Sequence, residues 1–236
     1  MQRFVLNPKL HLAVLVLCAM AIFTPATKAD PFLLGTVPTN PGVSVTPGLV
    51  LSGTPAGTLL ATLLVPYSFS TTAGTTSGTL LTAVFREAGG TLDFYYQVSN
   101  NANSATEIAR MTATSFGLFL TNTGFRTDGA SLAAGFVNGS VMPITADRNF
   151  TGTVVGFSFV PPAGNAILPG STSDVLVIST NATSFTAGNA SVIDGGTQTV
   201  AAFQPLGAPV PEPTTMLLFG TGLVGVAGAA RRRFRK

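Results

Sequence analysis

The chain has 236 residues, enough for one folded domain of ordinary size, and only 9% of them are charged. Its one histidine, His11, and its one cysteine, Cys18, both lie within the first 20 residues. If export removes that stretch, the remaining chain can use neither histidine nor cysteine chemistry, disulfides or Cys/His metal sites. We therefore expect no catalytic residues, no cofactor and no enzymatic activity.

Residues 1–29 have the features of a secretory signal peptide. Two basic residues precede an uninterrupted apolar run at residues 12–23. Such a run spans about 18 Å as a helix, which is too short for a bilayer core of about 30 Å. Cleavage after Ala29 would leave Asp30 as the first exported residue. Cleavage after Ala26 and an uncleaved anchor are the alternatives.

The C-terminal part of the chain contains three elements in order. A proline-rich linker at residues 204–213 ends in the motif Val210, Pro211, Glu212 and Pro213. Residues 214–230 carry no charge and would span about 25 Å as a helix, the lower limit for a transmembrane helix. Five basic residues then occupy the cytoplasmic tail at residues 231–236: Arg231, Arg232, Arg233, Arg235 and Lys236. Their charge favours the cytoplasmic side, which would leave the N-terminal body outside the cytoplasm.

These three elements together resemble the PEP-CTERM sorting signal. The signal occurs on exported proteins of Gram-negative bacteria that make exopolysaccharide. The resemblance implies that a membrane-embedded exosortase recognises the tail and cuts near the Pro-Glu-Pro motif. Tails of this kind also carry the label "ice-binding protein C-terminal domain", which describes the tail and implies no ice binding by the body. An ordinary C-terminal anchor after a proline-rich linker is the alternative.

The body, residues 30–209, has a different charge from the whole chain. It contains four arginines and eight carboxylates, a net charge of −4, whereas the whole chain carries +3. The positive balance therefore comes from the two ends. Scattered arginines in an acidic body do not supply the clustered Lys and Arg that phosphate contacts require, so we expect no nucleic-acid partner.

The first half of the body predicts an extended segment followed by strands. Residues 30–58 contain five prolines and predict an extended entry segment with one short strand at residues 43–50. A strand at residues 59–69 contains Pro66, which cannot donate a ladder hydrogen bond and therefore indicates a sheet edge or a strand end. Residues 71–78 have the composition of a loop. A hairpin follows at residues 79–99, with its turn at residues 87–90.

The second strand of this hairpin alternates clearly between two faces. The apolar residues on one face predict a core position: Leu92, Phe94, Tyr96 and Val98. The residues on the other face predict a position outside the core: Thr91, Asp93, Tyr95 and Gln97. Tyr95 is therefore the tyrosine that could present an aromatic surface to a sugar ring.

Further strands are predicted within residues 108–122, at 151–160 and at 174–180, with a long loop at 124–140 and a hairpin at 191–203. Seven to nine short strands with a turn every 8–12 residues predict that residues 59–203 form an antiparallel β-sandwich, jelly-roll or immunoglobulin-like. Stretches of this region are also similar to bodies found on other PEP-CTERM proteins, a resemblance that implies no activity.

Calcium is the one metal that the body could hold, because carboxylates and carbonyls are its ligands. Three carboxylates beside predicted strand ends are the candidates: Asp93, Asp147 and Asp174. The alternative is that they are ordinary exposed acids, since the chain contains no D-x-D-x-D-G loop.

The leading hypothesis is an exported, non-enzymatic protein of the cell envelope or extracellular matrix. A module that binds the cell's exopolysaccharide is the alternative. A glycoside hydrolase that uses two carboxylates is the third hypothesis, because this chemistry needs neither histidine nor cysteine.

Overall fold

Backbone hydrogen bonding joins the strands into two sheets in the computed structural model, which describes residues 34–160 and 166–207. The strands of the seven-stranded sheet are β1 (Val37–Pro38), β3 (Gly48–Leu49), β4 (Thr58–Thr71), β5 (Gly74–Arg86), β6 (Leu92–Asn100), β8 (Thr121–Arg126) and β11 (Val175–Thr180). The strands of the six-stranded sheet are β2 (Ser44–Val45), β7 (Arg110–Thr114), β9 (Thr145–Arg148), β10 (Val154–Ser158), β12 (Phe185–Asp194) and β13 (Gly196–Pro205).

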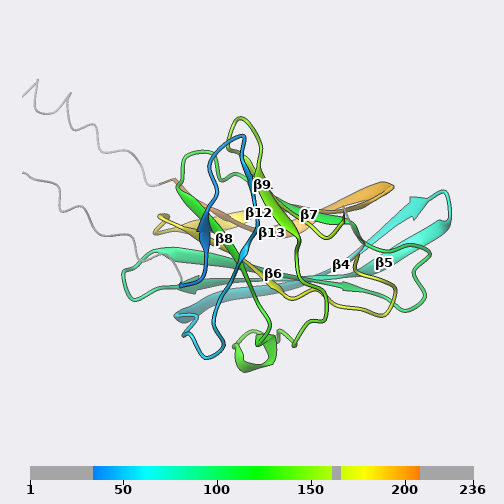
Figure 1. Ribbon diagram of the computed structural model, residues 1–236, viewed down its shortest axis with the longest axis horizontal. Coiled ribbons are helices and arrows are strands. Elements are labelled where there is room, and N and C mark those ends of the chain that lie inside the picture. The colour runs from blue at the N-terminus through cyan, green and yellow to red at the C-terminus, as the bar shows by residue number, and fades with distance from the viewer. Residues whose placement is uncertain (1–33, 161–165, 208–236) are drawn as a thin grey trace, which may run out of the picture. The chain divides into compact units, whose positions relative to one another are not determined.

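The two sheets lie face to face as layers (Figure 1). The larger sheet has the order β1-β8-β11-β6-β5-β4, and β3 also pairs with β8. The smaller sheet has the order β13-β12-β7-β10-β9-β2. All these pairings are antiparallel except the pairing of β3 with β8, which is parallel.

The all-β, antiparallel prediction is confirmed, but the expected count of seven to nine strands is wrong. The described residues form 13 strands. Strands β1, β2 and β3 have two residues each, so their sequences carry no alternation that could reveal them. The single strand expected at residues 43–50 is two strands, β2 and β3, which join different sheets.

The main core fills the space between the two sheets. The larger sheet contributes the four alternating residues of β6 that were predicted to face inward: Leu92, Phe94, Tyr96 and Val98. The smaller sheet contributes Met111, Phe157 and Val192, which are fully buried. The Tyr96 hydroxyl donates a hydrogen bond to the carbonyl oxygen of Phe203 at 3.2 Å, so the two sheets are also joined by a polar contact.

A second core covers the outer face of the seven-stranded sheet and corrects the other half of the β6 prediction. Tyr95 is fully buried and packs against Phe85 of β5, with ring centroids 4.7 Å apart, and against Phe136. Val50 and Ala56 complete this layer from the segment after β3. Alternation predicts opposite faces correctly, but it cannot show that loops far away in sequence cover the second face. Tyr95 therefore offers no surface to a sugar ring.

The β4–β5 hairpin is longer than the sequence predicts. Residues 71–78 were expected to be a loop, but the two strands continue through them to a turn between Thr71 and Gly74. Threonine is compatible with a strand as well as with a loop, and the pairing across β4 and β5 selects the strand. The prediction for Pro66 is confirmed, because β4 lies at the edge of its sheet.

Several other predictions can be compared with the described strands. The buried strand expected at residues 174–180 is β11, which is buried along its whole length. The loop expected at residues 124–140 begins later, because β8 extends to Arg126, and it contains the short 3-10 helix η1 (Gly129–Ser131). The hairpin at residues 191–203 is the middle of the longer β12–β13 hairpin.

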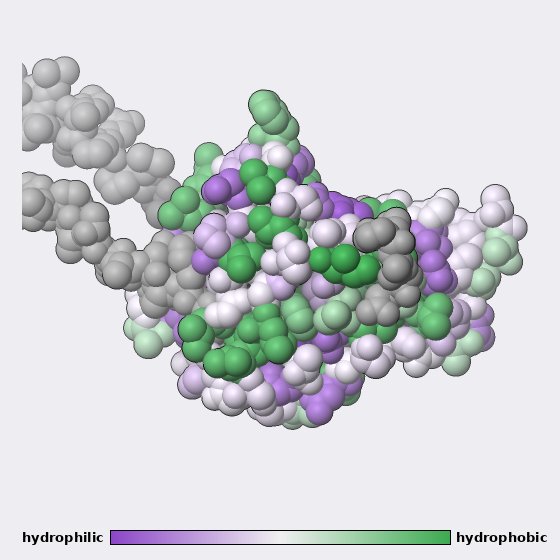
Figure 2. Space-filling model, in the orientation of Figure 1, coloured by the Kyte–Doolittle hydropathy of each residue, from purple (hydrophilic) through white to green (hydrophobic). Residues whose placement is uncertain are grey.

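Hydrophobic side chains gather on the surface over the N-terminal strands (Figure 2). Leu34, Leu49 and Leu51 of this segment are each about half exposed or more. Within the described residues, no helix is long and apolar enough to cross a membrane. The transmembrane helix expected at residues 214–230 lies outside these residues.

Candidate functional site

The three carboxylates named as calcium candidates lie in separate places. Asp93 is buried under the outer layer on β6, Asp147 lies on the outer side of β9, and Asp174 precedes β11. Within residues 34–160 and 166–207, no three or more His, Cys, Asp or Glu side chains form a group that could hold a metal ion. The fold therefore does not bring these three candidates together.

Asp147 is instead the partner of Arg110 on the smaller sheet. Arg110 donates from Nη1 to Asp147 Oδ1 at 2.6 Å and from Nη2 to Oδ2 at 2.8 Å. The guanidinium lies across Gly156 of the intervening strand β10, where any Cβ would overlap it. Because both side chains are about one-third exposed, solvent screens this pair.

A second ion pair joins Arg126 at the end of β8 to Asp128. The Arg126 side chain is 1% exposed and donates to both Asp128 oxygens at 2.9 Å. It also donates from Nη2 to the carbonyl oxygen of Thr54 at 2.7 Å. The hydrogen bonds from Arg126 lower the pKa of Asp128 to about 2.

Around Arg126, the outer core contains a group of buried polar atoms that we call the Asp93 cluster. Its members have no hydrogen-bond partner outside the cluster among the described residues: Glu87 Oε1, Asp93 Oδ2, Tyr95 Oη, Arg126 Nη1 and Ser179 Oγ. Buried polar groups are normally paired, so such a concentration marks an unusual region of the fold. A pocket of about 350 Å³ is lined by Arg126 and Phe85, but neither Glu87 nor Asp93 lines it.

The two carboxyl groups of the Asp93 cluster affect each other's titration. Burial raises the pKa of Asp93 well above its usual range, and the negative charge of Glu87 raises it further. Burial also raises the pKa of Glu87. Two acids in this position hold a proton more tightly than either would in water. Glu87 forms no ion pair with the neighbouring Arg86, because its carboxyl lies beside Asp93.

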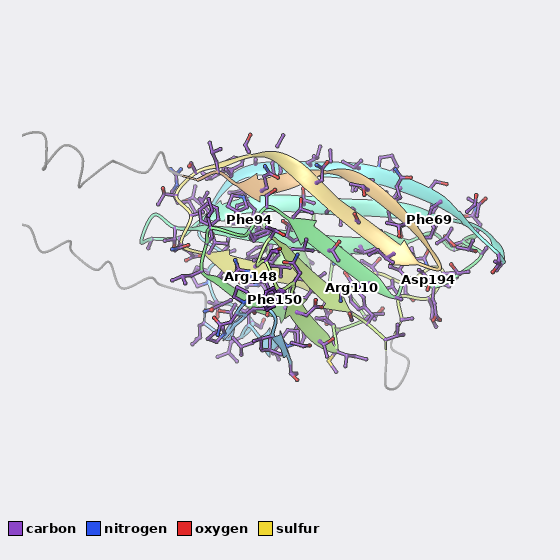
Figure 3. The ribbon with its side chains drawn as sticks, turned by 90° about the horizontal axis from the view of Figure 1, so that it is seen from above. Phe69, Phe94, Arg110, Arg148, Phe150 and Asp194 are labelled. Carbon is purple, nitrogen blue, oxygen red and sulfur yellow. The ribbon has the colours of Figure 1, made fainter. Side chains whose placement is uncertain are left out.

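A larger groove lies at one end of the sandwich, and we call it the Arg148 groove. Its volume is about 600 Å³. The segment before β2 lines it with residues 38, 40 and 41. The β7–β8 loop and the start of β8 contribute residues 117–122, and Arg148 and Asn181 complete the lining. Figure 3 shows Arg148, Phe150 and Phe94 toward one end of the sandwich, with Asp194 and Phe69 toward the other.

Arg148 is fixed by backbone carbonyl groups and has no carboxylate partner in the described part of the chain. Its Nε donates to Gly152 at 2.7 Å, and its Nη2 donates to Phe116 at 2.5 Å and to Phe119 at 2.9 Å. The residue is 5% exposed, and burial lowers the pKa of its guanidinium. The groove therefore has one fixed, uncompensated positive charge in its wall.

A role for Arg148 was not predicted from the sequence, in which the four arginines of the body are scattered. A signal was present, because Arg148 follows Ala146 at an interval of two residues and therefore shares its inward face. Only the fold shows that this inward position opens into a groove.

The sorting and cleavage residues expected from the sequence lie outside the described residues. These are Ala29, Asp30, the motif at residues 210–213 and the basic tail at residues 231–236.

Comparison with known proteins tests the sorting motif directly. No curated protein and no solved structure matches the chain significantly. The family model of the PEP-CTERM protein-sorting motif matches residues 209–233, which include the Pro-Glu-Pro motif, the apolar stretch and the first three arginines of the tail. The chain therefore carries a PEP-CTERM protein-sorting motif.

Proposed function

We propose that this chain is the precursor of an exported, non-enzymatic protein of the cell envelope or extracellular matrix. The observation that carries the proposal is the sorting motif at residues 209–233, which follows a β-sandwich body directly. In this proposal the signal peptide at residues 1–29 exports the body, and the C-terminal segment holds it in the membrane. An exosortase-type enzyme then cuts near residues 210–213 and places the body at the cell surface or in the matrix.

The absence of enzymatic activity is part of the proposal and has two supports. His11 and Cys18 belong to the stretch that export would remove. Among the residues that line the Arg148 groove, Arg148 is the titratable one, and an arginine stays protonated at physiological pH. General acid–base catalysis in this groove would therefore lack a group that can exchange a proton.

Export and sorting are tested by fractionation of a host that either contains or lacks an exosortase-type enzyme. We expect the body to reach the cell surface or the medium only when the enzyme is present. Replacement of Pro211, Glu212 and Pro213 by alanine should leave the protein in the membrane fraction. Glu107→Ala is the matched control, because it removes a carboxylate from the β-sandwich body and leaves the motif intact. It should distribute between the fractions as the wild type does. The same distribution for all variants would overturn the proposal.

The Arg148 groove favours a second candidate function, a module that binds exopolysaccharide. The groove combines a cation with amide side chains and an apolar rim, as sites for charged sugars require. Sedimentation with exopolysaccharide from the producing organism, with and without EDTA, tests this candidate. Saturable co-sedimentation would support it, and loss in EDTA would show that calcium takes part. No binding in either condition would leave the structural role.

A further inference from the structure

One nitrogen of the Arg148 guanidinium makes no hydrogen bond within the described residues. Nε and Nη2 are occupied by the carbonyl groups of Gly152, Phe116 and Phe119, whereas Nη1 makes no hydrogen bond within the described residues. Nη1 is also not among the unpaired side-chain atoms that are sealed from solvent, in contrast to Nη1 of Arg126. The guanidinium is therefore held in place and presents one N–H₂ group to an incoming acceptor.

The charge of the groove selects the kind of acceptor. Arg110 and Arg126 each have an aspartate partner, but no acidic residue lines the groove around Arg148. Burial of a cation without an anionic partner raises the free energy of the folded protein, and a ligand that carries one negative charge would offset that increase. A carboxylate matches this single charge, and a charge-assisted hydrogen bond to Nη1 would fix its position.

The rest of the lining suits a ring that carries hydroxyl groups. Asn181 uses its Oδ1 to accept a hydrogen bond from the backbone N–H of Leu120 at 2.9 Å, which leaves its Nδ2 without a partner in the described residues. Asn40 is a second amide in the lining. The rim is apolar, since Leu118 is 89% exposed and Leu120 is 57% exposed. Amides bind hydroxyl groups, and apolar side chains cover the C–H face of a sugar ring.

We propose that the Arg148 groove binds a hexuronate unit of an acidic polysaccharide, with the sugar carboxylate on Arg148 Nη1 and its hydroxyl groups on the two asparagine amides. This inference rests on the second candidate function and names its ligand class and its site. Its failure would leave export and sorting untouched, because those depend on residues 209–233.

The test uses the full chain, purified in a non-ionic detergent, and a galacturonate tetramer in the presence of EDTA. Isothermal titration calorimetry should detect saturable binding that weakens as salt is added, since the contact is ionic. The methyl-esterified tetramer is the matched ligand control, because it keeps the ring and the hydroxyl groups but loses the charge. Equal binding of the two tetramers, or no saturable binding of the charged one, would overturn the proposal.

Two substitutions place a negative charge at the groove without removing Arg148, whose loss could unfold the β7–β8 loop. Asn181→Asp keeps the oxygen that accepts the Leu120 N–H, and Leu118→Asp alters an exposed side chain. Each should weaken tetramer binding by about tenfold or more, because like charges repel at close range. Leu64→Asp is the control, because it adds the same charge at an exposed side chain of β4 outside the groove, and it should bind within about threefold of the wild type. If Asn181→Asp and Leu118→Asp, folded as judged by circular dichroism, bind the tetramer as the wild type does, the groove is not the site.

Discussion

The two ion pairs of the described residues differ mainly in their access to water. The side chains of Arg126 and Asp128 are 1% and 10% exposed, whereas those of Arg110 and Asp147 are 28% and 31% exposed. Removal of one partner from a buried pair leaves an unpaired charge in a poorly hydrated site. Removal of one partner from a half-exposed pair lets water replace it.

We therefore expect Asp128→Ala to lower the free energy of unfolding by about 3 kcal/mol. Asp147→Ala is the matched control and should cost less than about 1 kcal/mol. Because the pKa of Asp128 is lowered to about 2, its contribution is present above about pH 4 and is lost as the pH falls toward 2. Urea unfolding measures both variants, and similar losses for the two would contradict this account.

The Asp93 cluster should give stability the opposite dependence on pH. The pKa values of Asp93 and Glu87 are raised in the folded state, so the folded protein binds a proton more tightly than the unfolded chain. The resulting stabilisation is fully present below the unfolded pKa of about 4 and is lost as the pH rises through the raised pKa.

The substitution Asp93→Asn tests this dependence, because the amide resembles a protonated carboxyl and does not ionise. We expect the wild type to lose stability as the pH rises from about 4 through the raised pKa values, and the variant to lose less over the same range. Thermal unfolding as a function of pH measures the difference. Asp147→Asn, a change at the half-exposed pair, should leave the profile unchanged. A variant profile as steep as that of the wild type would rule out Asp93 as its source.

At the scale of elements, β6 shows how far a strand can be predicted from its own sequence. Its alternation gives the correct strand and assigns Phe94 and Tyr96 to the core. It cannot show that Tyr95 is also buried, because Val50 and Phe136 come from segments far away in the chain. The same limit applies to the two-residue strands, which exist only through their partners.

Glycines in the sheets mark places where a long side chain lies across a strand. Gly78 of β5 has Tyr67 of β4 on one side and Ser99 of β6 on the other. The Tyr67 hydroxyl reaches over Gly78 and donates to the carbonyl oxygen of Ser99 at 2.9 Å. A Cβ at position 78 would overlap both partners.

Gly78→Ala should therefore destabilise the body by about 1–3 kcal/mol, because the extra methyl group forces β4 and β6 apart. Thr75→Ala, at an exposed position on the same strand, is the control and should change stability by about 0.5 kcal/mol or less. Denaturant unfolding compares the two. Equal changes in the free energy of unfolding for the two variants would show that Tyr67 moves aside without loss of stability.

At the scale of the whole molecule, the Arg148 groove lies where the chain continues toward the sorting motif. Gly207 is next to Leu118 on the rim of the groove, and a Cβ built on Gly207 would be 4.0 Å from Leu118 Cδ1. Gly207 is the last described residue, and the sorting motif at residues 209–233 follows it in the sequence.

The sequence predicts the sorting motif and the Arg148 groove unequally. The sorting motif is a local pattern, so its residues at positions 210–213 and 231–236 identify it without a fold. The Arg148 groove is assembled from four separate segments, and its charge is uncompensated because the fold keeps the carboxylates of residues 34–160 and 166–207 away from it. No pattern within one segment contains that information.

Intact mass of the exported protein is the most direct test of the central claim. The account predicts a species that ends near residues 210–213 and lacks the basic tail, in cells that contain an exosortase-type enzyme. The Pro211, Glu212 and Pro213 to alanine variant should keep its full C-terminus. Mature wild-type protein that still carries residues 231–236 would contradict the claim.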